Sequence, residues 1–208
     1  KTKKEILKYS TVNQNKITVS GVCIHSIYKK KIKPFHKKEP KILIIGTSNN
    51  KNIKNILMSL IDIDCELIII GDLIKEYLFI LKKFKIKYKN YVALNNKTIF
   101  KKYIESDLLL FPSQYEGFGM PILEAQTVGR VVITSNLEPM ISVGGNGALY
   151  VNPYNVKNIN NTIKKVINNK SLRNKLIQNG FKNIKKFNKG EILKKHLDCY
   201  YNILKNNF

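Results

Sequence analysis

The sequence predicts an α/β protein, built as a Rossmann-like doubly wound parallel sheet with flanking helices. Three observations favour this fold class. From about residue 40 onward, short apolar stretches of strand length alternate with longer stretches of helical spacing. Two of the apolar stretches end at a glycine, and a turn carrying Gly117 and Gly119 stands between an apolar stretch and a helical one. Strands joined by helices require parallel pairing with right-handed crossovers, so the helices cover the faces of the sheet.

The residues before 40 do not follow this alternation. Residues 2–9 have the apolar side of a short helix, and residues 16–20 (Lys-Ile-Thr-Val-Ser) are typical of a strand. Residues 21–40 are rich in lysine and contain prolines that break regular structure. We therefore expect this stretch to be a linker.

The expected strands are apolar runs bounded by glycine, proline or asparagine. They lie at residues 41–45, 67–70, 91–94, 108–111, 131–134 and 148–151. The expected helices place apolar residues three or four positions apart, as at Ile53, Ile56 and Leu60. They lie at residues 52–60, 73–84, 97–105, 121–127, 155–168, 171–187 and 191–205. In such a sheet, ligands bind beyond the carboxyl ends of the strands. The loops that follow the strands lie at residues 46–51, 71–73, 94–97, 112–120 and 135–147.

The chain is strongly basic, with 37 lysines and arginines against 14 acidic residues and a net charge of +23. Only Arg130 and Arg173 are arginines, although arginine recognises phosphates and bases in a bidentate way that lysine does not. Lysine, asparagine and isoleucine are all abundant, which is typical of a low-GC genome. We interpret the charge as compositional, and an anionic membrane surface or nucleic acid remain as alternatives.

Several other classes do not fit the sequence. No apolar run approaches the roughly 20 residues that a membrane span needs. The basic first residues lead into no apolar region, so no signal peptide is expected, and the absence of an initiator Met favours a fragment or a processed chain. Cys23, Cys65 and Cys199 are odd in number and far apart, which favours reduced thiols in a cytosolic protein. The histidines lack ligand spacing, so we expect no zinc site.

One segment carries most of the chemical information. Residues 112–125 read Pro-Ser-Gln-Tyr-Glu-Gly-Phe-Gly-Met-Pro-Ile-Leu-Glu-Ala, after an expected strand and into an expected helix. Gly117 and Gly119 allow the backbone to approach a ligand closely, and Pro121 is tolerated in the first helical turn. The free N–H groups of a helix start, together with the helix dipole, favour an anion. The segment therefore predicts a diphosphate cradle.

Two carboxylates, Glu116 and Glu124, frame this turn. Like charges repel, so the two acids are not expected to contact phosphates. They can accept hydrogen bonds from hydroxyl groups on either side of a diphosphate. A nucleotide sugar has this layout, with sugar hydroxyls, two phosphates and ribose hydroxyls in order.

The segment from Glu116 to Glu124 resembles the Glu-x7-Glu signature of retaining glycosyltransferases of the GT-B fold. This is the group 1 or family 4 type, which includes sucrose synthases and bacterial mannosyl- and glucosyltransferases. The flanking sequence is similar too, and the resemblance covers roughly residues 2–205. It extends to residues 46–52, 125–136 and 148–153.

The resemblance implies a role for each matching residue. Glu116 would contact the hydroxyls of the donor sugar or support the transition state, and Glu124 would hold the ribose hydroxyls. Lys51 would neutralise the diphosphate leaving group, a task that a metal performs in other transferases, so neither a metal nor a cofactor is expected. The remaining expected donor-site residues are Gly117, Phe118, Gly119, Met120, Pro121, Val92, Ala93, Ser135 and Asn136. Among these, the amides of residues 118–120 would face the sugar and the distal phosphate, and residues 92 and 93 would face the base.

The sequence departs from the family at Thr47, where many members have an arginine after the first-loop glycine. This leaves Lys51, or Lys54, as the cation for the diphosphate. Residues 144–147 (Gly-Gly-Asn-Gly) are interpreted as a flexible turn and not as a second phosphate loop, because no helix start is expected after them.

The resemblance also suggests the domain organisation. Residues 1–39 correspond to a remnant of the acceptor-side domain and a linker, residues 40–187 to the donor domain, and residues 188–208 to a C-terminal helix. We expect the rest of the acceptor domain to be absent from this chain.

The predicted function is retaining transfer of a hexosyl group from a nucleotide-diphosphate sugar to an acceptor glycan or a lipid-linked acceptor. A cytoplasmic location follows, with peripheral membrane binding as an extension from the charge. One alternative is a nucleotide-sugar-binding module without activity, and another is a basic protein that binds nucleic acid or membranes. The scarcity of arginine and the lack of a nucleic-acid motif argue against nucleic acid as a partner.

Overall fold

The computed structural model describes residues 2–205, apart from the side chain of residue 191. Its centre is a six-stranded sheet in the order β3-β2-β1-β4-β5-β6, and every neighbouring pair is parallel. The strands are β1 (Lys41–Ile45), β2 (Glu66–Ile70), β3 (Lys87–Tyr91), β4 (Leu108–Phe111), β5 (Val131–Ser135) and β6 (Leu149–Val151). The predicted Rossmann-like doubly wound α/β fold is confirmed.

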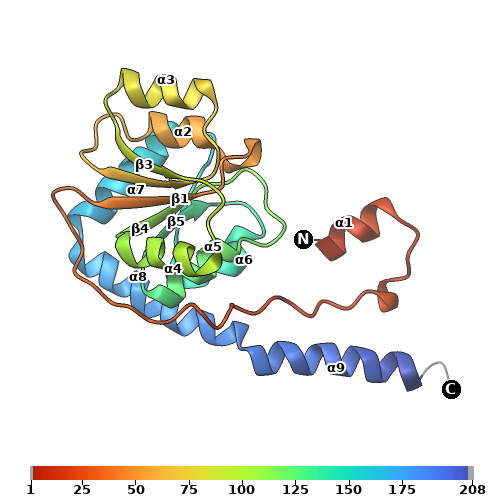
Figure 1. Cartoon of the computed structure of the whole chain (residues 1–208). Helices are drawn as coiled ribbons and strands as arrows, with labels where there is room; N and C mark the ends of the chain where they lie inside the picture. Colours follow the sequence, from red (N-terminus) through yellow and green to blue (C-terminus); the bar gives the residue numbers. More distant parts are fainter. Residues whose placement is uncertain (1, 206–208) are drawn as a thin grey trace.

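Helices cover the sheet on both faces (Figure 1). Successive strand residues point to opposite faces. In β1, Ile42 and Ile44 pack with apolar residues of α2 (Ile53–Met58), α3 (Lys75–Lys83) and α7 (Val156–Asn168). Leu43 packs on the other face, with residues of α4 (Asn96–Glu105), α5 (Met120–Val128) and α6 (Met140–Gly144). This double burial explains why the central strands are continuous apolar runs.

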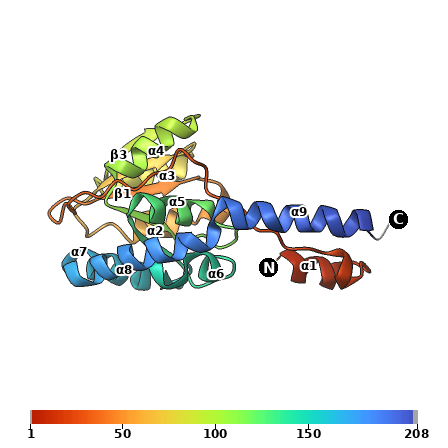
Figure 2. The same cartoon turned by 90° about the horizontal axis from the view of Figure 1, so that it is seen from below.

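Two helices lie at the ends of the described chain. α1 (Thr2–Tyr9) and α9 (Lys189–Lys205) extend beyond the sheet on the same side of the molecule (Figures 1 and 2). The start of α9 is anchored by Ile192, which is buried and lies near Gly21 of the linker. Among the described residues, no helix is both long enough and apolar enough to cross a lipid bilayer.

The linker, residues 21–40, contains no helix or strand, as predicted, and runs along the outside of the domain before entering β1 (Figure 1). Tyr28 of the linker is buried in the core on the α4 and α5 side. The backbone N–H of Lys31 donates to the carbonyl of Val128, at 3.1 Å. The linker is therefore packed against the domain along part of its length.

Two strand predictions were wrong. Residues 16–20 form no strand, because the described structure places no partner strand beside them; a 3-10 helix (η1, Gln14–Lys16) overlaps their start. The strand expected at residues 91–94 is β3, which ends at Tyr91. β3 is an edge strand with a polar, exposed sequence, so apolar runs did not reveal it. The other strands were predicted to within one residue of their ends.

The helices also differ from expectation at a few places. The helix expected at residues 171–187 is α8 (Lys170–Asn183), followed by a 3-10 helix, η4 (Ile184–Phe187). α6 was not predicted. Residues 144–147 are not a loose turn, since they include the end of α6 and a 3-10 helix, η3 (Gly145–Gly147). Gly147 lies so close to α8 that a Cβ there would come within 2.6 Å of the Cα of Gly180.

Candidate functional site

The candidate site lies where the strand order of the sheet reverses. β1 and β4 are neighbours, and the strands on either side of them were added in opposite directions. In sheets of this kind, ligands bind beyond the carboxyl ends of the strands at such a reversal. Gly46 follows β1 and Pro112 follows β4, so both loops selected from the sequence meet here.

The two loops meet in an ion pair. Lys51 ends a short 3-10 helix, η2 (Asn49–Lys51), and its Nζ lies 2.6 Å from Oε1 of Glu116. The side chains retain only 18% and 11% of their exposure. Lys51 Nζ also lies 4.6 Å from the centre of the Phe111 ring. The structure therefore brings together the two residues that the sequence proposed for catalysis, and it pairs them directly.

Gly46 makes room for this lysine. Its φ is +81°, and a Cβ at this position would lie 2.8 Å from Cε of Lys51. A residue other than glycine would be strained there and would also displace the lysine side chain. The position of Lys51 over the end of β1 thus depends on this glycine.

A network of amide groups holds the two loops in register. Asn52 has a left-handed backbone (φ 62°) and is buried. Its Nδ2 donates to the carbonyls of Pro112 (3.1 Å) and Pro153 (2.7 Å). The backbone N–H of Gln114 donates to the carbonyl of Asn50 at 2.8 Å. These bonds fix the β4 loop against the β1 loop, and therefore Glu116 against Lys51.

The start of α5 follows closely after Glu116 in the sequence. Gly119 is the N-cap residue, with φ +102°, and no side chain caps the helix. Pro121 stands in the first turn, as predicted. A Cβ on Gly117 would meet nothing within 4 Å, so the loop before the helix is open there. The ring of Phe118 makes an edge contact with Phe187, at 6.0 Å between centroids.

A model of the family "Glycosyl transferases group 1" matches residues 27–183. The chain belongs to the group 1 glycosyltransferases. One curated relative is CapM of Staphylococcus aureus, a capsular polysaccharide biosynthesis glycosyltransferase. It is 33% identical to this chain over 102 residues, which are 48% of this chain and 27% of CapM. RfbU of Salmonella typhimurium, an O-antigen chain mannosyltransferase, is 37% identical over 84 residues, which are 40% of this chain and 23% of RfbU.

Solved glycosyltransferases share the fold. A TarM variant from S. aureus superposes with a TM-score of 0.78 at 20% identity, over 95% of this chain and 42% of TarM. Sucrose-phosphate synthase from Thermosynechococcus elongatus superposes with a TM-score of 0.75 at 18% identity, over 88% of this chain and 52% of the synthase. The chain thus spans about a quarter of the length of the curated relatives and about half of these solved chains.

Glu124, the second acid of the predicted signature, has a different environment from Glu116. Tyr103 OH donates to its Oε2 at 2.7 Å, and Tyr28 of the linker is a second hydrogen-bond partner. Burial raises the pKa of Glu124, and the bonds from Tyr103 and Tyr28 oppose that rise. Burial likewise raises the pKa of both tyrosines, so they stay protonated as donors. The sequence did not reveal these tyrosines, because their distance from residue 124 in the chain gives no signal.

The other expected residues lie at the carboxyl ends of neighbouring strands. Val92 and Ala93 are exposed and follow β3 instead of lying within it, and Ala93 has a left-handed φ of 52°. Ser135 ends β5 and is buried, whereas Asn136 is exposed and donates its backbone N–H to Val151. Among the described residues, the hydroxyls of Ser113 and Ser135 are the buried side-chain groups without a hydrogen-bond partner.

Two further observations concern the cation of the site and possible metal ligands. Lys54, the alternative cation, forms an exposed ion pair with Glu76 at 2.8 Å, so Lys51 is the lysine that reaches Glu116. Within the described ranges, no three His, Cys, Asp or Glu side chains lie close enough to bind a metal ion together.

Proposed function

We propose that this chain supplies the donor site of a retaining glycosyltransferase, which moves a hexosyl group from a nucleotide-diphosphate sugar to an acceptor hydroxyl. The observation that carries the proposal is the partly buried ion pair of Lys51 and Glu116 at the carboxyl ends of β1 and β4. In the sequence, Glu116 comes just before the start of α5, which no side chain caps. A cation at this place can bind the diphosphate of a nucleotide sugar, and a carboxylate can accept hydrogen bonds from the hydroxyls of the sugar.

In this proposal, the diphosphate is held without a metal. The amides of Phe118, Gly119 and Met120 lie at the helix start, where no side chain occupies them as a cap. Helix-start amides and the helix dipole stabilise an anion. Lys51 adds a full charge that stabilises the leaving diphosphate as negative charge develops on it. Gly117 and Pro121 shape the turn that allows this approach.

The two acids take the hydroxyl groups on either side. Glu116, held by Lys51 in the free protein, exchanges part of that contact for the hydroxyls of the donor sugar. Glu124 accepts from the ribose hydroxyls, with Tyr28 and Tyr103 orienting its carboxylate. The exposed backbone at Val92 and Ala93 lies beyond β3 and contacts the base, while Ser135 and Asn136 line the β5 side.

The acceptor is proposed to be a glycan or a lipid-linked sugar. One relative, 26% identical over 102 residues, is an N-acetylgalactosaminyltransferase from Campylobacter jejuni named for a diphospho-undecaprenol acceptor. A net charge of +23 would assist binding to an anionic membrane surface. We do not propose a nucleic-acid partner, because Arg130 and Arg173, the two arginines, are both buried.

A second candidate function is binding of the nucleotide sugar without transfer by this chain alone. The chain spans 42% and 52% of two solved glycosyltransferases of the same fold, which favours a donor half that needs another polypeptide segment for transfer. Both candidates share the donor site, so a binding measurement tests their common basis.

The experiment is a thermal-shift panel with UDP, GDP and ADP. A nucleotide that binds the native state at 100 times its Kd stabilises it by about 2.7 kcal/mol. We expect one of the three to raise the Tm, and Lys51→Ala to lose most of this rise. Lys54→Ala is the matched control and should keep the rise. The proposal fails if none of the nucleotides raises the Tm, or if Lys51→Ala responds like the wild type.

Transfer itself is tested in a full-length enzyme that contains this domain. Glu116→Ala there should lower kcat/KM by about 100-fold or more, the cost of removing an interaction that stabilises the transition state. The anomeric configuration of the product, read by NMR, decides between retention and inversion. Full activity of Glu116→Ala would remove this residue from the proposed mechanism.

A further inference from the structure

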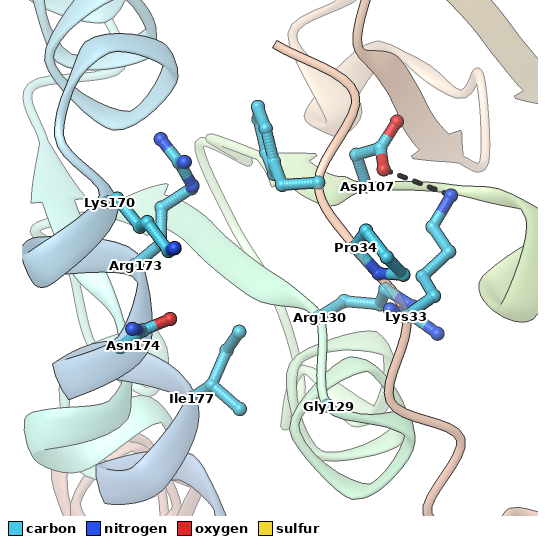
Figure 3. Close-up of a pocket in the computed structure, with 10 residues that line it drawn as sticks. Lys33, Pro34, Asp107, Gly129, Arg130, Lys170, Arg173, Asn174 and Ile177 are labelled. Carbon is cyan, nitrogen blue, oxygen red and sulfur yellow. Dashed lines mark ion pairs between the residues drawn. The ribbon is translucent and has the colours of Figure 1, made fainter.

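A cavity lies at the opposite end of the sheet from the donor-site loops. Its volume is about 390 Å3, and it sits between the linker and the first turns of α8 (Figure 3). Asp107 and Arg130, which line it, directly precede β4 and β5, so the cavity is at the amino ends of these strands. The proposed donor site uses none of its lining residues.

Both arginines of the chain line this cavity. The sequence has 37 basic residues, and all but Arg130 and Arg173 are lysine. The two arginines are 3% and 8% exposed. All the remaining basic residues of the chain are lysine. A planar guanidinium at both of these positions therefore indicates a requirement for forked donor geometry.

Part of that requirement is structural. Arg130 donates through Nε to the carbonyl of Tyr103 at 2.8 Å and through Nη2 to the carbonyl of Lys31. Arg173 donates through Nη1 to the carbonyls of Val166 (2.7 Å) and Ile167 (2.8 Å) at the end of α7. Within the described chain, these bonds use two of the five N–H groups that each guanidinium carries. The bonds hold both groups rigid and leave donors for a ligand.

Positive charge in the cavity is not balanced. Lys33, Lys170 and the two arginines line it, and Asp107 is the single carboxylate among the lining residues. The Asp107 side chain is fully buried, pairs with Lys33 at 2.9 Å and accepts the backbone N–H of Lys41 at 2.8 Å, so it serves several partners (Figure 3). The nearby Glu105 carboxylate pairs instead with Lys102.

Burial is the main cause of the lowered pKa values of the cations that line the cavity. Burial lowers the pKa of Arg130 to about 10, and Asp107 only partly opposes this. Burial also lowers the pKa of Lys33, and the charges of Arg130 and Lys41 lower it further, against the effect of Asp107. An anion entering the cavity would stabilise the charged forms of these buried groups.

The walls of the cavity also suit a ligand with an organic part. Figure 3 shows Lys170, Arg173, Asn174 and Ile177 on the α8 side, facing Pro34 and Arg130 across the hollow. Phe35 also lines the cavity, and its ring stacks on the guanidinium of Arg173, at 4.2 Å from the ring centre to Cζ. The cavity therefore offers cations on both sides with apolar surface between them.

We propose that this cavity is a binding site for a small phosphorylated molecule, with Arg130 and Arg173 as forked donors to the phosphate. Lys33 and Lys170 add charge, and the apolar walls contact the carrier of the phosphate. The same chemistry is present in a phospholipid headgroup. The recessed position between the linker and α8 commits the proposal to a dissolved ligand.

Hydrogen–deuterium exchange of the full chain tests this with inorganic phosphate as the probe. Chloride of equal ionic strength is the reference. We expect phosphate to slow exchange in the linker around residues 31–36 and in α8 around residues 170–177. The protection should persist in Lys51→Ala, which separates this cavity from the donor site.

Two variants probe the donors. Arg173→Lys keeps the charge and loses the fork, and Lys170→Ala removes an exposed side chain whose loss the fold tolerates. We expect Arg173→Lys to raise the phosphate concentration for half-maximal protection about tenfold, the effect of losing a charge-assisted hydrogen bond, and Lys170→Ala to raise it by a smaller factor. Lys182→Ala, on the same helix and outside the cavity, is the matched control and should change nothing.

The outcomes separate the explanations. Protection that chloride reproduces at equal ionic strength would reflect general screening and overturn the proposal. Equal responses from wild type, Arg173→Lys and Lys170→Ala would also overturn it. Protection by vesicles that contain phosphatidic acid, without protection by dissolved phosphate, would identify a lipid headgroup and contradict the commitment to a small ligand.

Discussion

The ion pair between Lys51 and Glu116 can be measured directly with a double-mutant cycle. The four proteins are wild type, Lys51→Ala, Glu116→Ala and the double variant. At 2.6 Å and an effective dielectric constant of about 20, the Coulomb attraction is about 6 kcal/mol before desolvation is counted. Desolvation of two mostly buried charges cancels much of this, because it costs several kcal/mol per ion.

We therefore expect a coupling free energy of about 2 kcal/mol, within the range of about 0.5–3 kcal/mol for residues in contact. The stability losses of the two single variants should add up to more than the loss of the double variant. The reason is that each single variant leaves one charge without its partner, at 11% or 18% exposure. Urea denaturation of all four proteins gives the free energies of unfolding.

A control and a ligand sharpen this test. The exposed pair of Lys54 and Glu76 has a similar distance, 2.8 Å, but lies in water, and its cycle should show no coupling beyond experimental error. With a saturating nucleoside diphosphate, the coupling of Lys51 and Glu116 should fall, because the phosphates compete for Lys51. Additivity of the Lys51 and Glu116 variants within about 0.5 kcal/mol, without ligand, would show that the pair does not form.

Three further expectations concern the fold and the second acid. Gly147→Ala should cost about 1–3 kcal/mol in urea denaturation, because its Cβ would lie 2.6 Å from Gly180 Cα, whereas Gly117→Ala meets nothing within 4 Å and should stay within about 0.5 kcal/mol of wild type; equal losses would contradict this close approach. Tyr103→Phe should cost about 1–2 kcal/mol, because Glu124 loses a buried donor at 2.7 Å, and an unchanged Tm would exclude that bond. Burial raises the pKa of Glu124 above its usual 4.5, so the folded state holds its proton more tightly than the unfolded state. Wild type should therefore lose stability relative to Glu124→Gln as the pH rises from below 4.5 through the raised pKa, and a pH-independent difference in Tm would refute the shift.

The sequence was sufficient for the fold class, and the reason is the pattern of burial. Central strands that are covered on both faces must be apolar throughout, so β1 and β4 were found with their correct ends. β3 is an edge strand whose residues face water, so its sequence carries no apolar run and its position was missed. α6 is only five residues long, which is too short for a helical period to be recognised.

The site shows the same division. The glycine-lined turn before α5 and the acids around it are local in sequence, so a short sequence pattern was enough to predict them as site residues. The partners of those acids are not local. Lys51 lies 65 positions from Glu116, and Tyr103 lies 21 positions from Glu124. No periodicity links residues at such distances.

The sequence by itself thus determined the alternation of the central strands with their helices, and with it the loops that follow the carboxyl ends of these strands. These features depend on short-range patterns of apolar residues, glycine and proline. Only the tertiary structure decided that Lys51 is paired with Glu116, that a tyrosine from the linker reaches Glu124, and that both arginines converge on one cavity. Each of these depends on which distant segments the sheet order brings side by side, and that order emerges from packing the whole chain.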